Sequence, residues 1–189
     1  MEKVIGVLLI LVLVLTLLCS CFESVEDHYG NVDDSSEGNG SLNPDGTHSE
    51  DVDSVFLSIE CGTILDNWDD LDPALQDEKY VPKDGIILEK TEFVIEEGTT
   101  VFDVLVMATR KYKIQMEYQG ADANAFGSVY IEGINHLYEF SCGSLSGWMY
   151  LVNGTFPNYG CSKYQVKDGD VIQWVYTCDL GRDIGCDWL

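Results

Sequence analysis

Residues 167–177, KDGDVIQWVYT, contain the clearest strand pattern of the chain. Its Asp168-Gly169-Asp170 is typical of a tight turn, and β-branched and aromatic residues dominate the segment Val171–Cys178 that follows. Trp174 and Tyr176 are two residues apart, so they project from the same face of a strand. The pattern therefore predicts a strand with an aromatic face near the end of the folded part of the chain.

A second segment with the same aromatic spacing precedes it, GWMYLVNG at residues 147–154. Trp148 and Tyr150 are again two residues apart, and Asn153-Gly154 favours a tight turn with positive φ angles. Two neighbouring strands of this kind would form an aromatic surface. Aromatic side chains in such a pattern more often belong to the core than to a ligand-binding surface. The residues between them are apolar too, so both faces of the strands could be covered. A docking surface is therefore the second interpretation.

One segment, Thr99–Lys111, has the pattern of a helix, which Thr99 or Thr100 can cap. The segments that read as strands surround it: Val55–Cys61, Ile86–Leu88, Glu92–Ile95, Ile114–Tyr118, Ser128–Ile131, Leu137–Phe140, Trp148–Val152 and Tyr164–Val166. One helix on a curved mixed sheet predicts the α+β class. We expect a single β-grasp-like domain over residues 54–181, followed by a C-terminal tail at residues 182–189.

The N-terminal residues resemble those of a bacterial lipoprotein precursor. Val4–Leu18 is an almost unbroken apolar run, which is short for a permanent transmembrane helix and predicts a signal peptide over residues 1–20. Leu18-Cys19-Ser20-Cys21 fits the lipobox, with an aliphatic residue at −3 and a small residue at −1 before the cysteine. We expect Cys21 to be lipidated and the protein to be anchored on the extracytoplasmic face of the cell membrane. An ordinary signal peptide or a retained N-terminal anchor is the alternative.

The segment after the signal peptide, residues 21–53, is predicted to consist of the lipidated cysteine and an acidic disordered tether. Residues 22–53 are rich in Asn, Ser, Gly and Asp and contain no Lys or Arg. Such a composition cannot bury enough apolar surface to offset the entropy that ordering would cost. We expect the tether to hold the folded domain away from the membrane surface.

Three segments carry a family resemblance: EGTTVFDVL at residues 97–105, SLSGWMYLVNG at 144–154 and GCSKYQVKDGDVIQWVYT at 160–177. Together they resemble the C-terminal domain of transcobalamin and intrinsic factor, in the domain of unknown function 4430 family. In the vitamin carriers this domain closes over one face of cobalamin, and an all-helical barrel covers the other. The resemblance implies a binding role without a resident cofactor. It implies cobalamin or a related ligand only together with a helical-barrel or transporter protein.

The candidate ligand-binding residues are those of the aromatic strands: Gly147, Trp148, Tyr150, Asn153 and Trp174. The alternative function is a structural or adhesive module that docks another protein and has no small-molecule ligand. An enzyme is not expected, because the sequence shows no nucleophile motif, no recognisable pair of catalytic carboxylates and no phosphate loop. The closest match, GSLSG at residues 143–147, has Leu at the centre where the nucleophile-elbow motif requires Ser.

Five cysteines follow Cys21: Cys61, Cys142, Cys161, Cys178 and Cys186. Their spacing lacks the close CxxC pairs of a structural zinc site, so disulfides are expected outside the reducing cytoplasm. In a β-grasp fold the first and last strands run parallel as neighbours, which predicts a Cys61–Cys178 disulfide. Cys142 and Cys161 flank the hairpin at 147–154, which predicts a second one. Cys186 has no assigned role.

The charge balance excludes one class of partner. Acidic residues outnumber basic ones by 33 to 10, and the formal net charge is −23. Such a chain repels phosphate backbones, so no nucleic acid is expected as a partner. The acidic run at residues 66–72 lacks the spacing of a calcium loop, and His136 is the only histidine of the expected domain. We therefore expect no metal site.

Overall fold

The computed structural model of the protein describes residues 52–125 and 127–186. All of these belong to one compact unit, Ser49–Leu189. The predicted signal peptide, Cys21 and nearly all of the predicted tether lie outside the described residues. Within the described residues, no helix is both long and apolar enough to cross a membrane.

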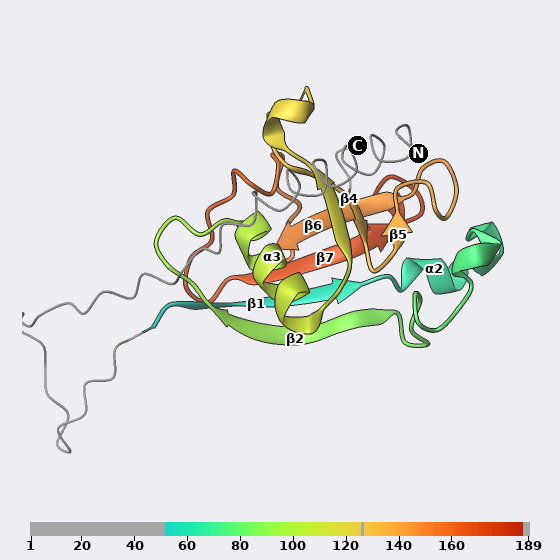
Figure 1. Ribbon diagram of the computed structural model, residues 1–189, viewed down its shortest axis with the longest axis horizontal. Helices are drawn as coiled ribbons and strands as arrows, with labels where there is room; N and C mark the ends of the chain where they lie inside the picture. The colour runs from blue at the N-terminus through green and yellow to red at the C-terminus, as the bar shows by residue number, and fades with distance from the viewer. Residues whose placement is uncertain (1–51, 126, 187–189) are drawn as a thin grey trace, which may run out of the picture. The chain divides into compact units, whose positions relative to one another are not determined.

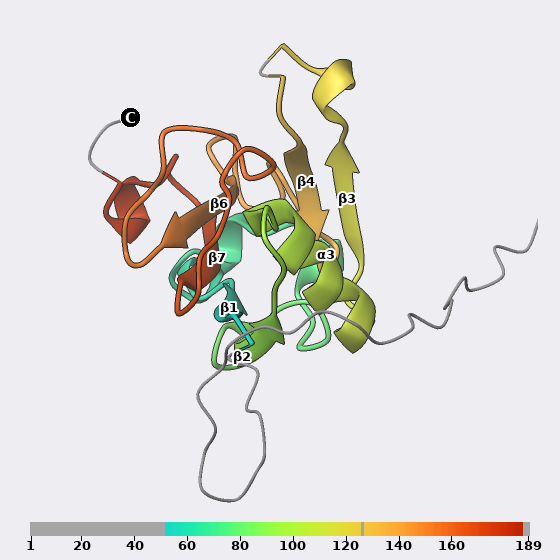
Figure 2. The same cartoon turned by 90° about the vertical axis from the view of Figure 1, so that its left-hand side faces the viewer.

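Seven strands of the described residues form two sheets (Figures 1 and 2). The larger sheet has the order β2-β1-β7-β6 and consists of β2 (Ile86–Val94), β1 (Ser54–Glu60), β7 (Val171–Thr177) and β6 (Gly147–Val152). Its central strands β1 and β7 run parallel, and both outer pairs are antiparallel. The smaller sheet is antiparallel, with the order β3 (Met116–Gln119), β4 (Tyr130–Ile134) and β5 (Leu137–Tyr138).

The predicted α+β class and mixed sheet are confirmed, including the parallel first and last strands. The strands form two sheets instead of one curved sheet. Two of the expected strand segments also differ from the sequence-based prediction. The expected strand pair within residues 86–95 is the single strand β2, because register shifts against β1 absorb the irregular centre of the segment. The expected strand Tyr164–Val166 lies outside both sheets, because its backbone bonds to the start of the helix: Val101 N donates to Tyr164 O, and Val166 N donates to Thr99 O.

The predicted helix is α3 (Val101–Tyr112), and Thr100 is its N-cap. Thr100 Oγ1 accepts the Asp103 amide at 3.2 Å, and the Asp103 carboxylate accepts the Thr100 amide at 2.9 Å, which forms a capping box. The helix packs on β1 and β2 with a buried stripe of Val101, Val104, Leu105, Ala108 and Thr109. The other helical segments are short: α2 (Thr63–Asp66), η1 (Trp68–Asp70), η2 (Pro73–Leu75), η3 (Ala121–Ala123) and η4 (Arg182–Ile184).

Buried apolar side chains form two clusters. The main cluster lies between α3 and the larger sheet and includes Leu57, Leu105 and Trp174. The second cluster comprises Cys61, Ile64, Leu71, Val81, Leu137, Cys142 and Tyr176. It contains the buried side chain of α2, so it joins the acidic segment after β1 to the far end of β7.

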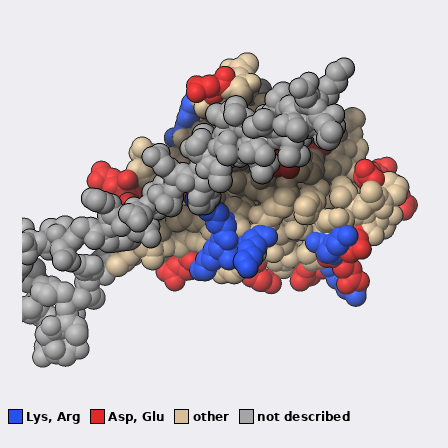
Figure 3. All heavy atoms as spheres, in the orientation of Figure 1, with Lys and Arg blue, Asp and Glu red and all other residues tan. Residues whose placement is uncertain are grey.

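Charged side chains do not gather by sign on the face seen in Figure 3. There, Lys and Arg side chains lie among Asp and Glu side chains.

Candidate functional site

The four aromatic side chains of β6 and β7 face one another in pairs. The register places Trp148 opposite Tyr176 and Tyr150 opposite Trp174, with ring centroids 5.2 Å and 5.5 Å apart. Trp174 and Tyr176 are 2% and 1% exposed, whereas Trp148 and Tyr150 are only partly buried. The rings of β7 are therefore part of the core, whereas the rings of β6 reach the surface.

A cleft of about 540 Å³ opens beside β6. It is lined by residues 128–130 at the start of β4, residues 139–140 and 145–149, Gly160, Thr177 at the end of β7, and Leu180. A smaller cavity of about 130 Å³ adjoins the cleft and shares Val129, Tyr130, Trp148 and Gly160 with it. Tyr150 and Trp174 line this smaller cavity. Trp148 thus lies between the cleft and the smaller cavity, and the cleft has a volume in the range of small-molecule sites.

Exposed apolar side chains gather around the cleft. Phe140 is 63% exposed, Leu180 44%, Leu145 41% and Tyr130 36%, and all four line it. Single exposed apolar residues are common, but several around one concave space are typical of a contact surface. The side chains come from three loops or loop edges, so only the tertiary structure brings them together.

Two of these rim residues have an unfavourable backbone conformation. Phe140 has a φ angle of 65° and Leu180 one of 50°, in the left-handed region that favours glycine. Hydrogen bonds hold both loops in place, since Phe140 N donates to Ser146 O at 3.0 Å and Leu180 N donates to Leu145 O at 2.9 Å. The left-handed backbone conformation costs on the order of 1 kcal/mol of folding free energy at each position. The rest of the fold offsets this cost, and both large apolar side chains lie at the rim.

Polar groups on the cleft walls are already used within the protein. Trp148 Nε1 donates to Leu137 O at 2.7 Å, and the Tyr130 hydroxyl donates to the Glu139 carboxylate at 2.6 Å. The Tyr150 hydroxyl donates to Tyr159 O at 2.6 Å. Burial raises the pKa of Tyr130 above its usual value, and the Glu139 carboxylate raises it further. These tyrosines therefore stay neutral and fix the shape of the walls.

Trp174, which lines the smaller cavity, carries a polar atom that is not used in this way. Its Nε1 is buried and has no hydrogen-bond partner in the described part of the protein. A buried indole N–H without a partner is uncommon in folded proteins. It is an unused donor on a wall residue of the smaller cavity.

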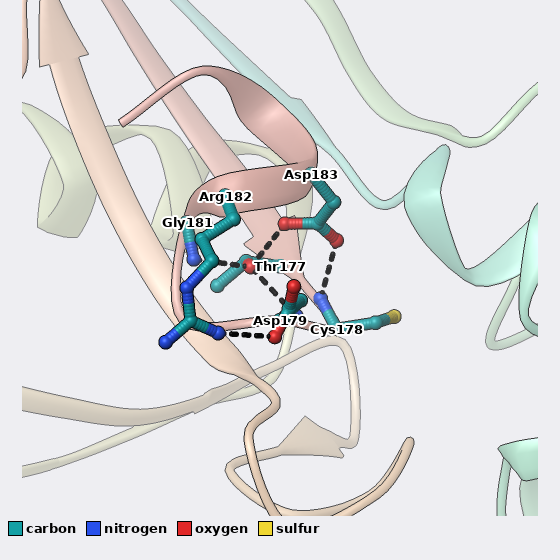
Figure 4. A network of polar contacts seen from close by, with 6 residues as sticks. All are labelled: Thr177, Cys178, Asp179, Gly181, Arg182 and Asp183. Atoms are coloured by element: carbon teal, nitrogen blue, oxygen red, sulfur yellow. Dashed lines mark hydrogen bonds and ion pairs between the residues drawn. The ribbon is translucent and has the colours of Figure 1, made fainter. Parts of the chain in front are cut away.

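A polar network after β7 holds one end of the cleft (Figure 4). Thr177 Oγ1 donates to the Asp183 carboxylate and accepts the Gly181 amide at 2.7 Å. The other oxygen of Asp183 accepts the Cys178 amide at 2.7 Å. Because Thr177 and Leu180 both line the cleft, this network fixes the position of the rim at that end.

The structure brings four of the five predicted ligand-binding residues to these spaces. Gly147 and Trp148 line the cleft, and Trp148, Tyr150 and Trp174 line the smaller cavity. Asn153 lines neither: it has a φ angle of 52° in the turn after β6, where its side chain bonds to the Val171 amide and the Asp170 carboxylate. Its amide group therefore stabilises the hairpin end.

Sequence reasoning missed the four exposed rim residues. Phe140 was expected in a strand but lies just beyond β5, and Leu145 and Leu180 lie in loops. The sequence does contain one indication of such residues, namely a large apolar side chain among Gly, Ser and Asp in a predicted loop. This pattern does not indicate which loops meet in the folded domain.

The five cysteines of the described residues are free thiols. Neither predicted disulfide, Cys61–Cys178 or Cys142–Cys161, is therefore present in the structure. Cys142 belongs to the second cluster and Cys161 to the main cluster, because the loop with Cys142 folds back toward α2 while Cys161 packs near β4. No three His, Cys, Asp or Glu side chains of the described residues gather closely enough to hold a metal ion.

Comparison with protein families identifies most of the region that carries the cleft. Residues 98–178 match the family model described as "Domain of unknown function (DUF4430)". The expected relation to this family is confirmed. The DUF4430 segment runs from just before α3 to just after β7, and it includes β4, β6 and nearly all of the cleft. Strands β1 and β2, which complete the larger sheet, precede it.

Other comparisons add little beyond the DUF4430 match. Curated proteins give no match to the sequence. One similar solved structure is that of a "putative metal binding protein" from Ruminococcus gnavus ATCC 29149, with 11% identity and a TM-score of 0.38. The match covers 66% of this chain and 96% of that one. A likeness this distant carries no argument about function.

Proposed function

We propose that the protein is a non-enzymatic lipoprotein of the extracytoplasmic membrane surface, and that its cleft binds an apolar face of a small-molecule ligand. The observation that carries the binding role is the set of exposed apolar side chains around the cleft: Tyr130, Phe140, Leu145 and Leu180. A volume of about 540 Å³ lies within the range of small-molecule sites. Lipid on Cys21 would keep the captured ligand at the membrane.

The proposed ligand class is cobalamin or a related corrinoid. The resemblance to the cobalamin-covering domain of transcobalamin supports this class. The apolar walls suit the face of a large ring, and the unpartnered Trp174 Nε1 suits an acceptor atom on a substituent that enters the smaller cavity. An open cleft leaves the other face of such a ring exposed, so we propose that a helical-barrel or transporter protein completes the site.

Isothermal titration calorimetry of the full chain in detergent, with cobalamin and with cobinamide, tests this function. We expect saturable binding with a dissociation constant in the micromolar range or below. Phe140→Ser should weaken it at least tenfold, because the side chain is at the rim of the cleft. Tyr112→Ser is the matched control, since Tyr112 is also exposed, at 43%, but ends α3 and does not line the cleft. Absence of heat with both ligands would contradict the proposal.

The second candidate function is that of a protein-docking module without a small-molecule ligand. The same exposed rim favours it, because a partner protein could cover Phe140, Leu145 and Leu180 with apolar side chains of its own. A photo-crosslinking residue in place of Phe140 would then capture a partner in intact cells, and one in place of Tyr112 would not. Calorimetric binding of a corrinoid that depends on Phe140 would favour the first function.

A further inference from the structure

Two cysteines that sequence reasoning assigned to different partners lie next to each other. Cys142 lies in the loop between β5 and β6, and Cys178 directly follows β7. Both side chains pack in the second cluster, and each thiol acts on the pKa of the other. Each thiol also contacts the segment of α2: Cys142 Sγ donates to Asn67 O at 3.4 Å, and Cys178 Sγ donates to Thr63 Oγ1 at 3.7 Å. The same short helical turn therefore positions both sulfur atoms.

The backbone on both sides of this thiol pair is held by other contacts. Cys142 forms a β-bridge with Leu71, and its amide donates to Ser146 Oγ at 3.0 Å. The Cys178 amide donates to the Asp183 carboxylate, and Figure 4 shows the Cys178 side chain directed away from that network. Both backbones are therefore held beside the same helical segment, which keeps the two thiols near each other in the reduced protein.

The other thiols of the described residues lie in different surroundings. Cys161 Sγ donates to Val129 O at 3.6 Å, in the main cluster. Cys61 shares the second cluster, but the charged groups that act on its thiol are Asp84 and Glu60. Cys186 packs beside Gly181. Among the described residues, Cys142 and Cys178 are thus the two cysteines whose thiols contact the segment of α2.

We propose that Cys142 and Cys178 form a disulfide that joins two neighbouring rim loops of the cleft. Along the chain, Cys142 lies between the rim residues Phe140 and Leu145, and Cys178 lies between Thr177 and Leu180. The two loops already meet where Leu180 N donates to Leu145 O at 2.9 Å. The bond would therefore connect the two loops whose apolar side chains form the rim. It would replace both pairings that the sequence predicted.

The oxidant is a disulfide reagent, either a dithiol oxidoreductase in its disulfide form or oxidised glutathione. One cysteine thiolate attacks the reagent's disulfide and releases one thiol, which leaves a mixed disulfide. The second thiolate attacks the protein sulfur of that mixed disulfide, forms the Cys142–Cys178 bond and releases the second thiol. The two cysteines lose two electrons and two protons, and the reagent's sulfur atoms gain them.

Peptide mapping of the full chain tests the proposal directly and needs no ligand. The purified protein in detergent is incubated with oxidised glutathione, its remaining thiols are alkylated, and its peptides are analysed with and without reductant. We expect one reductant-sensitive peptide pair that joins Cys142 to Cys178, with Cys61 and Cys161 alkylated. Alkylation of both Cys142 and Cys178, or a bond from either one to Cys61 or Cys161, would overturn the proposal.

Thermal unfolding provides a second measurement. The oxidised protein should unfold at a temperature on the order of 10 °C higher than the reduced protein, because the bond closes a loop of roughly 35 residues in the unfolded chain. Cys178→Ser should abolish this difference, and Cys161→Ser, the matched control, should retain it. Should Cys178→Ser fail to fold, the peptide map of the unsubstituted protein still decides the outcome. An oxidised protein that unfolds at the same temperature as the reduced one counts against the proposal.

Discussion

The indole ring of Trp148 packs edge-on against the phenol ring of Tyr176, with centroids 5.2 Å apart and ring planes at 80°. The polar ends of both rings donate to one segment: Trp148 Nε1 bonds to Leu137 O at 2.7 Å, and the Tyr176 hydroxyl bonds to Tyr138 O at 2.6 Å. This pair of side chains therefore ties β6 and β7 of the larger sheet to β5 of the smaller one. The cleft lies beside this junction.

Trp148→Ala should lower the free energy of unfolding by about 3 kcal/mol, because it removes a large, partly buried ring and leaves Leu137 O without its donor. Urea denaturation measures this loss. Trp148→Phe keeps a ring beside Tyr176 and should recover about half of it. If Trp148→Ala lowers stability but leaves ligand affinity unchanged, the residue acts only as core, and the cleft as proposed is not the binding site.

Phe140→Gly should separate binding from stability. Glycine tolerates the φ angle of 65° at this position, so relief of strain offsets the extra freedom of the unfolded chain, and stability should change by less than about 1 kcal/mol. The loss of the exposed ring should nevertheless weaken corrinoid binding at least tenfold. Thermal unfolding and calorimetry on the same sample measure both. Undiminished affinity would show that the rim takes no part in binding.

Gly133→Ala should destabilise the smaller sheet. A Cβ atom at Gly133 of β4 would lie 2.6 Å from the ring of Tyr138, its partner on β5. The Tyr138 hydroxyl donates to the Glu117 carboxylate, so the ring cannot move without cost, and we expect a loss of about 1–3 kcal/mol in urea denaturation. Gly120→Ala is the control, because nothing lies within 4 Å of its Cβ position and its φ angle is −64°. Equal effects of both substitutions would contradict this account.

Alkaline pH should destabilise the reduced protein more than the oxidised one. Burial, together with the hydrogen bond to Cys142, raises the pKa of Cys178 from 9.0 to about 12. A thiol with a raised pKa in the folded state stabilises that state fully below pH 9, and this stabilisation is lost as the pH rises toward 12. The disulfide removes this titration. Denaturation midpoints measured from neutral pH upward should therefore diverge between the two forms above pH 9, and parallel curves would be evidence against the bond.

Much of the fold could be predicted from local patterns. The capping box needs only Thr100 and Asp103, which are three residues apart. The turn at Asn153-Gly154 needs two adjacent residues with positive φ angles, and the structure has 52° and 74° there. The spacing of Trp174 and Tyr176 fixes which face of β7 they share, because side chains alternate along a strand. Each of these features depends on neighbours in the sequence.

The candidate site was only partly predictable, and the cysteine partners were not. Trp148, Tyr150 and Trp174 were found because they follow the strand period. Phe140 and Leu180 follow no period, and they form one rim because separate loops meet there.

Local sequence patterns were sufficient to predict most elements, the parallel centre of the sheet and the match of residues 98–178 to the DUF4430 family. Only the folded domain shows which loops meet, which thiols contact the segment of α2 and which aromatic rings reach the cleft. The difference lies in the range of the contacts involved. Caps, turns and strand faces depend on residues within one turn or one period, whereas cavities and thiol pairs depend on segments that only the packing of the whole domain brings together.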